Sequence, residues 1–171
     1  MQVVKAPNPA LRVQTKQVKK ITPGLKTTLK EMIKLTKTFK DPEGVGLAST
    51  QVSLNEAFFV VKDKEKFISV INPKVISASK KTKLYFEGCL STPNIWGEVK
   101  RHIGIKVSFM DETGKLQTKA LKGILAWIFQ HEIDHINGII FQDRVLEQKG
   151  KFYKFTGKDK TGTDTFEEMT I

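Results

Sequence analysis

The chain has 171 residues, a length that suits one domain, residues 1–171, with one sizeable hydrophobic core. No apolar run approaches the ~20 residues of a membrane span, and the N-terminus lacks the apolar segment of a secretory signal. A single cysteine, Cys89, excludes an intramolecular disulfide. Together these features predict a soluble protein of the reducing cytoplasm with no membrane partner.

The formal charge of +11 is concentrated at one end of the chain. Residues 1–40 contain ten Lys or Arg against one acid, Glu31, and carry a net charge of +9. A surface of one sign attracts polyanions through counterion release and long-range steering. The alternative is a solvated face that only confers solubility. No motif indicates sequence-specific binding of nucleic acid.

The first quarter is expected to hold an extended segment and then a helix. Pro7 and Pro9 disfavour a helix in residues 1–20. Thr22 and Pro23 form a good helix start, a cap followed by a first-turn proline. Apolar residues then recur at helical spacing as far as the breaker Asp41-Pro42-Glu43-Gly44.

Strands are expected to dominate the middle of the chain. Before them, residues 44–51 are small enough for a backbone to approach a ligand closely, but they lack the third glycine and the preceding strand of a nucleotide fingerprint. Alternating or β-branched runs then predict strands, the first two as a hairpin. These strands cover residues 57–61, 67–71, 74–77, 83–86, 103–109 and 116–121.

An apolar run, residues 123–129, leads without a turn signal into Gln130-His131-Glu132, and Gly138 suits a helix C-cap. A helix that is apolar on nearly every side is central and buried. Beyond it we expect a strand or irregular return over 139–145, a turn over 158–164 and a last strand over 166–171. The pattern predicts an α+β fold with mixed or antiparallel sheets around this central helix and a second, N-terminal helix.

The central helix contains the pattern H-E-x-x-H. His131 and His135 lie one turn apart on one face, so both imidazoles can bind one divalent metal ion. Glu132 is one position further round the helix than His131, so its carboxylate can reach a metal-bound water molecule without binding the metal itself. The alternative is a solvated helix face. The apolar run that leads into the motif favours the metal site, and so does the presence in the motif of two of the chain's three histidines.

A hydrolytic metal site takes three protein ligands and an open position. The third ligand is any carboxylate, His102 or Cys89. Cys89 follows a predicted strand and, as a thiolate, is a strong ligand, although a lone cysteine is also a common small buried hydrophobe. The charges of Glu87 and Arg101 flank this segment, so the two side chains are predicted to pair and steady its strand.

Three segments together resemble the signature motifs of the peptide deformylases, in the same order and with matching spacing. They are Gly-Val-Gly-Leu-Ala-Ser-Thr-Gln at 44–51, Glu-Gly-Cys-Leu-Ser at 87–91 and Gln-His-Glu-Ile-Asp-His at 130–135. The resemblance runs through most of the chain. It implies a metal-dependent hydrolase that removes the formyl group from N-formylmethionyl nascent peptides and releases formate.

The resemblance assigns roles residue by residue. Cys89, His131 and His135 match the metal ligands, Glu132 the general acid/base, and Gln51 with the backbone N–H of Leu90 the oxyanion donors. The resemblance also implies Fe(II) as the metal in the cell, with zinc, nickel or cobalt as replacements, and the ribosome as the partner of the basic first quarter. The substrate site is predicted to comprise Gly46, whose backbone contacts substrate, with Val45, Gly88, Leu125, Trp127 and Ile128.

Three positions depart from the family pattern. Ser49 replaces a usual alanine, Trp127 is larger than the aliphatic residue of the methionine pocket, and Trp96 stands where some relatives carry a basic residue. The tail also lacks the long basic helix of some bacterial members. Two alternatives remain: an amidase for another N-acyl substrate, suggested by Trp127 and Trp96, and a non-catalytic RNA- or ribosome-binding protein, suggested by the basic first quarter.

Overall fold

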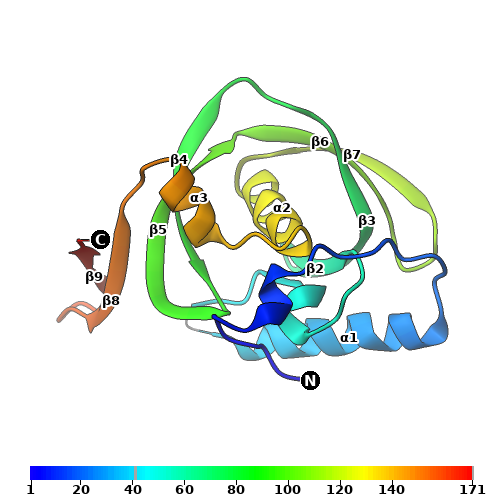
Figure 1. Cartoon of the computed structure of the whole chain (residues 1–171), viewed down its shortest axis with the longest axis horizontal. Coiled ribbons are helices and arrows are strands. Elements are labelled where there is room, and N and C mark those ends of the chain that lie inside the picture. The colour runs from blue at the N-terminus through cyan, green and yellow to red at the C-terminus, as the bar shows by residue number, and fades with distance from the viewer. Residues whose placement is uncertain (41, 171) are drawn as a thin grey trace.

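Two antiparallel β-sheets and the helix α2 (Gly123–Ile136) that they enclose make up most of the chain (Figure 1). The computed structural model describes residues 1–40 and 42–170. Every pairing between its named strands is antiparallel. The predicted α+β class is therefore confirmed.

The larger sheet has five strands in the order β1-β2-β3-β6-β7. Their bounds are β1 Gly46–Ala48, β2 Phe58–Asp63, β3 Lys66–Ala78, β6 Gly104–Met110 and β7 Leu116–Lys122. The predicted hairpin is β2–β3, and two separately predicted strands fuse into the long β3. Its register shifts between Ile71 and Lys74, which lets one strand bend around the central helix.

The smaller sheet has four strands in the order β4-β5-β8-β9. Their bounds are β4 Thr82–Cys89, β5 Thr92–His102, β8 Phe152–Lys158 and β9 Asp164–Met169. β5 was not predicted, because Pro93 and Gly97 interrupt its pattern. β8 and β9 form a hairpin across the predicted turn, at the left of Figure 1. The predicted last strand included Ile171, which lies outside the described residues.

Helix α2 is held by a core that it shares with the larger sheet. Ala126 and Phe129 are fully buried, and the Phe129 ring meets the Phe59 ring edge to face with centroids 5.3 Å apart. Burying one such side chain stabilises a fold by roughly 1.5–3 kcal/mol. The apolar first half of α2 thus anchors the helix in the core, and the second half carries the polar side chains of the motif.

Helix α1 (Pro23–Thr38) covers the other face of the larger sheet, along the lower edge of Figure 1. The Thr22 side chain accepts from the Leu25 N–H at 3.1 Å, which confirms the predicted cap. Leu29 and Met32 are buried against strands of this sheet. Asp41, part of the predicted helix breaker, lies outside the described residues.

Two local predictions were wrong. Residues 139–145 do not form a strand, because Phe141 and Val145 are buried at helical spacing in α3 (Phe141–Glu147) and the Asp143 carboxylate accepts from the Ile140 N–H at 2.9 Å. Asn8 caps a short 3₁₀ helix, η1 (Pro9–Arg12), inside the expected extended segment. The glycine-rich segment is ordered as β1 and a second 3₁₀ helix, η2 (Ser49–Val52). Within the described residues, no helix is both long and apolar enough to cross a bilayer.

Candidate metal centre and active site

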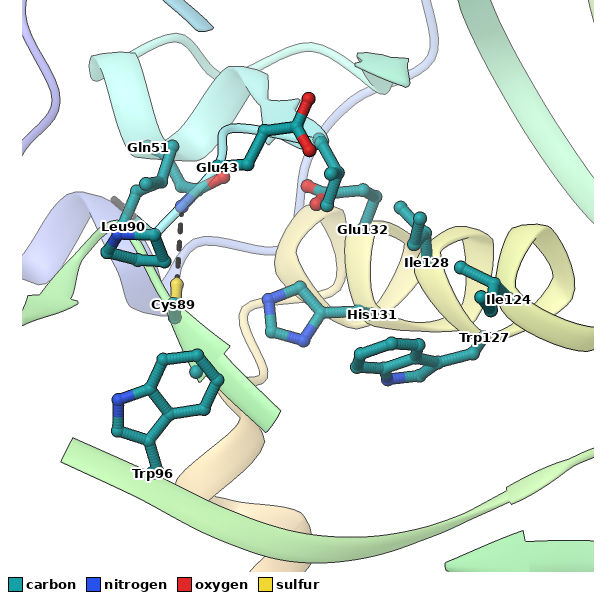
Figure 2. A pocket seen from close by; sticks show the side chains of 14 residues that line it. Glu43, Gln51, Cys89, Leu90, Trp96, Ile124, Trp127, Ile128, His131 and Glu132 are labelled. Carbon is teal, nitrogen blue, oxygen red and sulfur yellow. Dashed lines mark hydrogen bonds between the residues drawn. The ribbon is translucent and has the colours of Figure 1, made fainter. Parts of the chain in front are cut away.

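Helix α2 carries His131, Glu132 and His135, and it faces the strand that ends at Cys89. Figure 2 shows His131 and Glu132 extending from this helix on the side of Cys89. The Cys89 Sγ atom lies 3.2 Å from Nε2 of His135. One donor atom from each of Cys89, His131 and His135 falls within 4.8 Å of the other two. A thiolate and two imidazoles at this spacing suit a tetrahedral divalent ion with one position left for water or substrate.

The electrostatics of these three residues favour a cation among them. Burial by itself raises the pKa of the Cys89 thiol, but His135 and His131 bring it well below its ordinary value. Burial by itself lowers the pKa of His131, yet Cys89 and Glu87 raise it well above its ordinary value. A buried site that stabilises a thiolate and an added positive charge fits a bound metal ion, since metal ligation deprotonates a thiol.

A buried carboxylate stands behind the first histidine. Nδ1 of His131 lies 2.9 Å from Oε2 of Glu87, so the imidazole donates from Nδ1 and its Nε2 lone pair is left for the metal. Burial raises the pKa of Glu87, but hydrogen bonds from His131 and Arg101 outweigh it and hold that pKa at about 2. Glu87 therefore stays ionised and fixes the orientation of the His131 ring.

Glu87 is itself part of a network of buried charges. Nε and Nη2 of Arg101 donate to its two carboxylate oxygens at 2.7 and 3.0 Å, which confirms the predicted pair. The same guanidinium donates to Asp134 at 2.5 Å, and Arg144 donates to Asp134 from another side. The indole N–H of Trp127 donates to Glu87 at 2.8 Å. Each side chain in the network thus has its partners, as burial requires.

Glu132 lies beside the ligand set with one carboxylate oxygen unpaired. Its side chain is 3% exposed, and its Oε2 atom has no hydrogen-bond partner among the described residues. Burial raises the pKa of Glu132 to about 7, and it outweighs the lowering effect of the nearby His131 and His135. A group that exchanges a proton near neutral pH, next to a metal site, is suited to general acid and base chemistry.

The glycine at position 46 makes room for that carboxylate. A Cβ atom there would lie 2.2 Å from Oε1 of Glu132, closer than any side chain could pack. The glycine-rich segment therefore lies directly against Glu132, and any larger residue at position 46 would displace that carboxylate.

Gln51 points its amide toward the metal ligands. Its Oε1 accepts from the Ala48 N–H at 2.9 Å, which orients the NH₂ group toward Sγ of Cys89 at 3.3 Å and Oγ of Ser91 at 3.1 Å. The N-terminal segment ties both neighbouring loops together, because the N–H groups of Val4 and Ala6 donate to the backbone oxygens of Gln51 and Ser91. The amide hydrogens are thus held at the site before any ligand arrives.

A cavity of about 290 Å³ opens above these groups (Figure 2). All the predicted substrate-site residues line it except one. Leu125 packs toward the core instead, and the preceding residue, Ile124, lines the cavity, because successive helix positions face different directions. The lining includes Val45, Gly46, Gln51, Gly88, Cys89, Leu90, Trp127, Ile128, His131 and Glu132, together with Pro42, Glu43, Trp96 and Ile124.

Sequence reasoning missed the role of Glu87 toward His131, and it left His102 open as a ligand. Glu87 and Cys89 are two residues apart on one strand, a spacing that indicates a shared face and could have revealed that role. His102 is exposed, and its Nδ1 lies 2.6 Å from the backbone oxygen of Ser79, away from the ligand group. The Ser49 hydroxyl is accommodated by donating to the Glu56 backbone oxygen at 2.6 Å.

Relatives of known identity are similar to this chain in sequence over most of its length. The chain is 39% identical over 142 residues to the peptide deformylase of Thermotoga neapolitana, covering 83% of this chain and 85% of that protein. It is 40% identical over 157 residues to the peptide deformylase of Borreliella burgdorferi, covering 90% and 93%.

Solved structures lead to the same family. The peptide deformylase of Thermotoga maritima matches with a TM-score of 0.79 at 36% identity, over 84% of this chain and 95% of that one. That of Synechococcus elongatus, solved with actinonin, matches with a TM-score of 0.80 at 33% identity, over 84% and 78%. The sequence model of the polypeptide deformylase family matches residues 1–151. The chain therefore belongs to the polypeptide deformylase family, metal-dependent hydrolases that remove the N-formyl group from nascent peptides.

Proposed function

We propose that Cys89, His131 and His135 hold the divalent metal ion of this deformylase and that Glu132 is its general acid and base. The observation that carries the proposal is the buried, unpaired carboxylate oxygen of Glu132 beside three converging donor atoms. The metal in the cell is Fe(II), and zinc, nickel or cobalt can replace it, since a thiolate and two imidazoles suit all four.

When bound, the ion supplies Lewis acidity and makes a nearby water molecule acidic enough to yield hydroxide near neutral pH. Glu132 takes the proton from that water as hydroxide attacks the formyl carbon. Because burial raises the pKa of Glu132, this carboxylate can hold the proton and then give it to the departing amine nitrogen. Formate and a free N-terminal methionine are the products.

Gln51 and Leu90 are proposed to stabilise the oxygen of the formyl group as it gains negative charge. The Gln51 amide already faces the site, and Leu90 lines the same cavity. One such donor is typically worth ~2.7–4 kcal/mol in the transition state. The interaction of the Gln51 amide with Cys89 must give way to the substrate oxygen for this role.

The cavity is proposed to bind the methionine side chain. Val45, Trp127 and Ile128 supply apolar walls, and Gly46 and Gly88 bring backbone close to the substrate. Ile124 takes the place expected for Leu125. A cavity of about 290 Å³ is at the lower end of the range for small-molecule sites and suits one amino-acid side chain.

The lysines of α1 are proposed to contact the ribosome, in the cytoplasm where nascent peptides emerge. Lys26, Lys30, Lys34 and Lys37 are exposed, and their spacing places them along one side of the helix. A stripe of like charge attracts ribosomal RNA through counterion release and carries no base specificity. Replacing Lys26, Lys30 and Lys34 by Gln should weaken ribosome co-sedimentation and flatten its salt dependence. The same change at exposed Lys106, Lys115 and Lys122 should not.

The activity is tested by formate release from formyl-Met-Ala-Ser, with protein purified anaerobically and its metal content measured. Cys89→Ala should lose metal, and Cys89→Asp should retain some, shifted toward harder ions. If Cys89→Ala binds metal as tightly as the parent, the third ligand lies elsewhere. Absence of turnover with each reconstituted metal would favour a non-catalytic binding protein, and release of acetate from acetyl-Met-Ala-Ser without formate release would favour another N-acyl substrate.

A further inference from the structure

The β8–β9 hairpin is an addition to the part of the chain that the family model matches. That match ends at residue 151, and the hairpin begins at Phe152. The hairpin joins the smaller sheet directly beside the active site, because Trp96 of β5 pairs with Tyr153 of β8. Its residues are therefore placed to contact whatever extends beyond the metal centre.

A second cavity, of about 260 Å³, lies between this hairpin and the metal centre. Pro42, Cys89, Leu90 and Trp96 line both this cavity and the first, so the two adjoin. Phe155 of β8 and Asp164 of β9 contribute to its wall from the hairpin side. We call this second space the hairpin cavity.

The hairpin also fixes the wall that separates the two cavities. The Trp96 indole packs on Gly88, where an added Cβ atom would lie 2.9 Å from the ring. Phe86 stacks on the indole with centroids 5.3 Å apart, and Phe166 of β9 meets it edge to face at 5.5 Å. Figure 2 shows the indole next to Cys89. An aromatic contact from β9 thus sets the shape of the active-site rim.

The charged groups at the hairpin cavity are already engaged. Nζ of Lys5 donates to the Leu90 backbone oxygen at 2.5 Å, and Asp164 accepts from Lys158 at 2.5 Å. The surfaces left for a ligand are therefore chiefly aromatic and aliphatic: the rings of Trp96 and Phe155 with the side chain of Ile95.

Resting on the deformylase activity proposed above, we propose that the hairpin cavity binds a residue that follows the formylmethionine and selects a bulky apolar side chain there. An extended peptide advances about 3.3 Å per residue, and its next side chains reach past Leu90 and Trp96 once the formyl group is at the metal centre. Phe155 is the specificity-determining residue, because it faces this cavity from outside the catalytic machinery.

The test compares kcat/KM for formyl-Met-Ala-Ser, formyl-Met-Phe-Ser and formyl-Met-Ala-Phe with the metal-loaded full chain. The parent should prefer one of the Phe peptides by about tenfold or more, the usual effect of an apolar pocket contact. Phe155→Ala should reduce that preference to near unity, and Phe155→Leu should keep part of it. Lys154→Ala, at an exposed neighbour on the same strand, should leave the preference unchanged.

Each outcome separates the two proposals. Turnover of all three peptides at equal efficiency by the parent, or an unchanged preference in Phe155→Ala, would overturn the role of the hairpin cavity while the deformylase activity stands. Release of no formate from any of the three would overturn the proposed function itself. Melting curves of both Phe155 variants, matched to that of the parent, show that the fold is intact.

Discussion

The metal centre and the hairpin cavity share Cys89, Leu90 and Trp96 in their walls, but different forces hold them. Behind the metal centre, the side chains of Glu87, Arg101 and Asp134 form buried ion pairs and are only 0, 6 and 9% exposed. In the hairpin that borders the hairpin cavity, aromatic rings pack together and the ion pairs are exposed: the side chains of Lys151 and Glu168 are each more than half exposed.

The difference determines what each region tolerates. A buried charge network fails as a whole when one member is lost, because the remaining charges have no solvent to replace it. Aromatic and exposed ionic contacts are lost one at a time and cost little each. The chemistry therefore rests on the rigid region, and substrate preference is free to vary in the other.

The largest effect is expected from a substitution that removes the general base of the metal centre but leaves its structure intact. Glu132→Gln keeps the size of the side chain but removes its basicity, so kcat should fall by about 10²–10⁴ or more. Metal content should be unchanged, because the converging ligand atoms come from Cys89, His131 and His135. Formate release and metal analysis on the same sample check both points. Stoichiometric loss of metal in this variant would show that Glu132 is a ligand.

The second largest effect is expected on stability, when one member of the buried charge network is removed. Arg101→Met leaves Glu87 and Asp134 buried without their shared guanidinium, and the free energy of unfolding should fall by about 3–5 kcal/mol. Denaturant titration followed by tryptophan fluorescence measures it. Lys151→Met, which breaks the exposed pair with Glu168, is the matched control and should change stability little. Equal losses in the two variants would mean that burial does not distinguish the regions.

The features of the metal centre that depend on local sequence pattern could be predicted from the sequence. Helical spacing placed His131 and His135 on one face, and the charges flanking Cys89 predicted the pair of Glu87 with Arg101. The parts it missed depend on long-range packing. Helix α3 forms where a strand or irregular return was expected because Phe141 packs into the core with Cys89 and Val99, and β5 is a strand because β4 and β8 pair with it on either side.

Within the site, the same division holds for individual side chains. The sequence indicated that Trp127 lies one turn before His131 and faces the cavity, whose lining it joins. Its hydrogen bond to Glu87 could not be predicted, because the indole N–H and the carboxylate meet across 40 residues of chain. Ile124 lines the cavity where Leu125 was expected, because Ile124 lies three, four and seven residues before Trp127, Ile128 and His131 and so shares their helix face, whereas Leu125 packs toward the core.

Trp127 belongs to both regions, so its replacement sharpens the comparison. Trp127→Leu removes a wall of the pocket and the hydrogen-bond donor to Glu87. It should change the ratio of kcat/KM between formyl-Met and formyl-norvaline peptides by a factor equivalent to ~1–3 kcal/mol. Trp127→Phe also removes the donor but keeps a ring able to stack on Tyr85, as the indole does with centroids 4.7 Å apart. It should therefore shift the ratio less.

Rates for both substrates in both variants decide the role of Trp127. If Trp127 serves only to orient Glu87, each of the Leu and Phe variants should lower kcat/KM for both substrates by the same factor. An unchanged ratio would remove Trp127 from the methionine pocket and leave Val45 and Ile128 as its walls.

The smallest expected effect lies in the hairpin. Phe166→Leu removes edge-to-face contacts with Phe86 and Trp96, whose ring centroids lie 4.9 and 5.5 Å away. Such contacts are worth ~0.5–1.5 kcal/mol each beyond the area they bury, and a leucine recovers part of that area, so the net loss should be about 1 kcal/mol. In a chain of this length that corresponds to a fall in Tm of about 2–4 °C. Calorimetry measures the shift, with exposed Glu167→Ala as a control on the same strand. A shift as large as that of Arg101→Met would show that the aromatic wall is as indispensable as the buried charges, and the hairpin could not then vary independently of the metal centre.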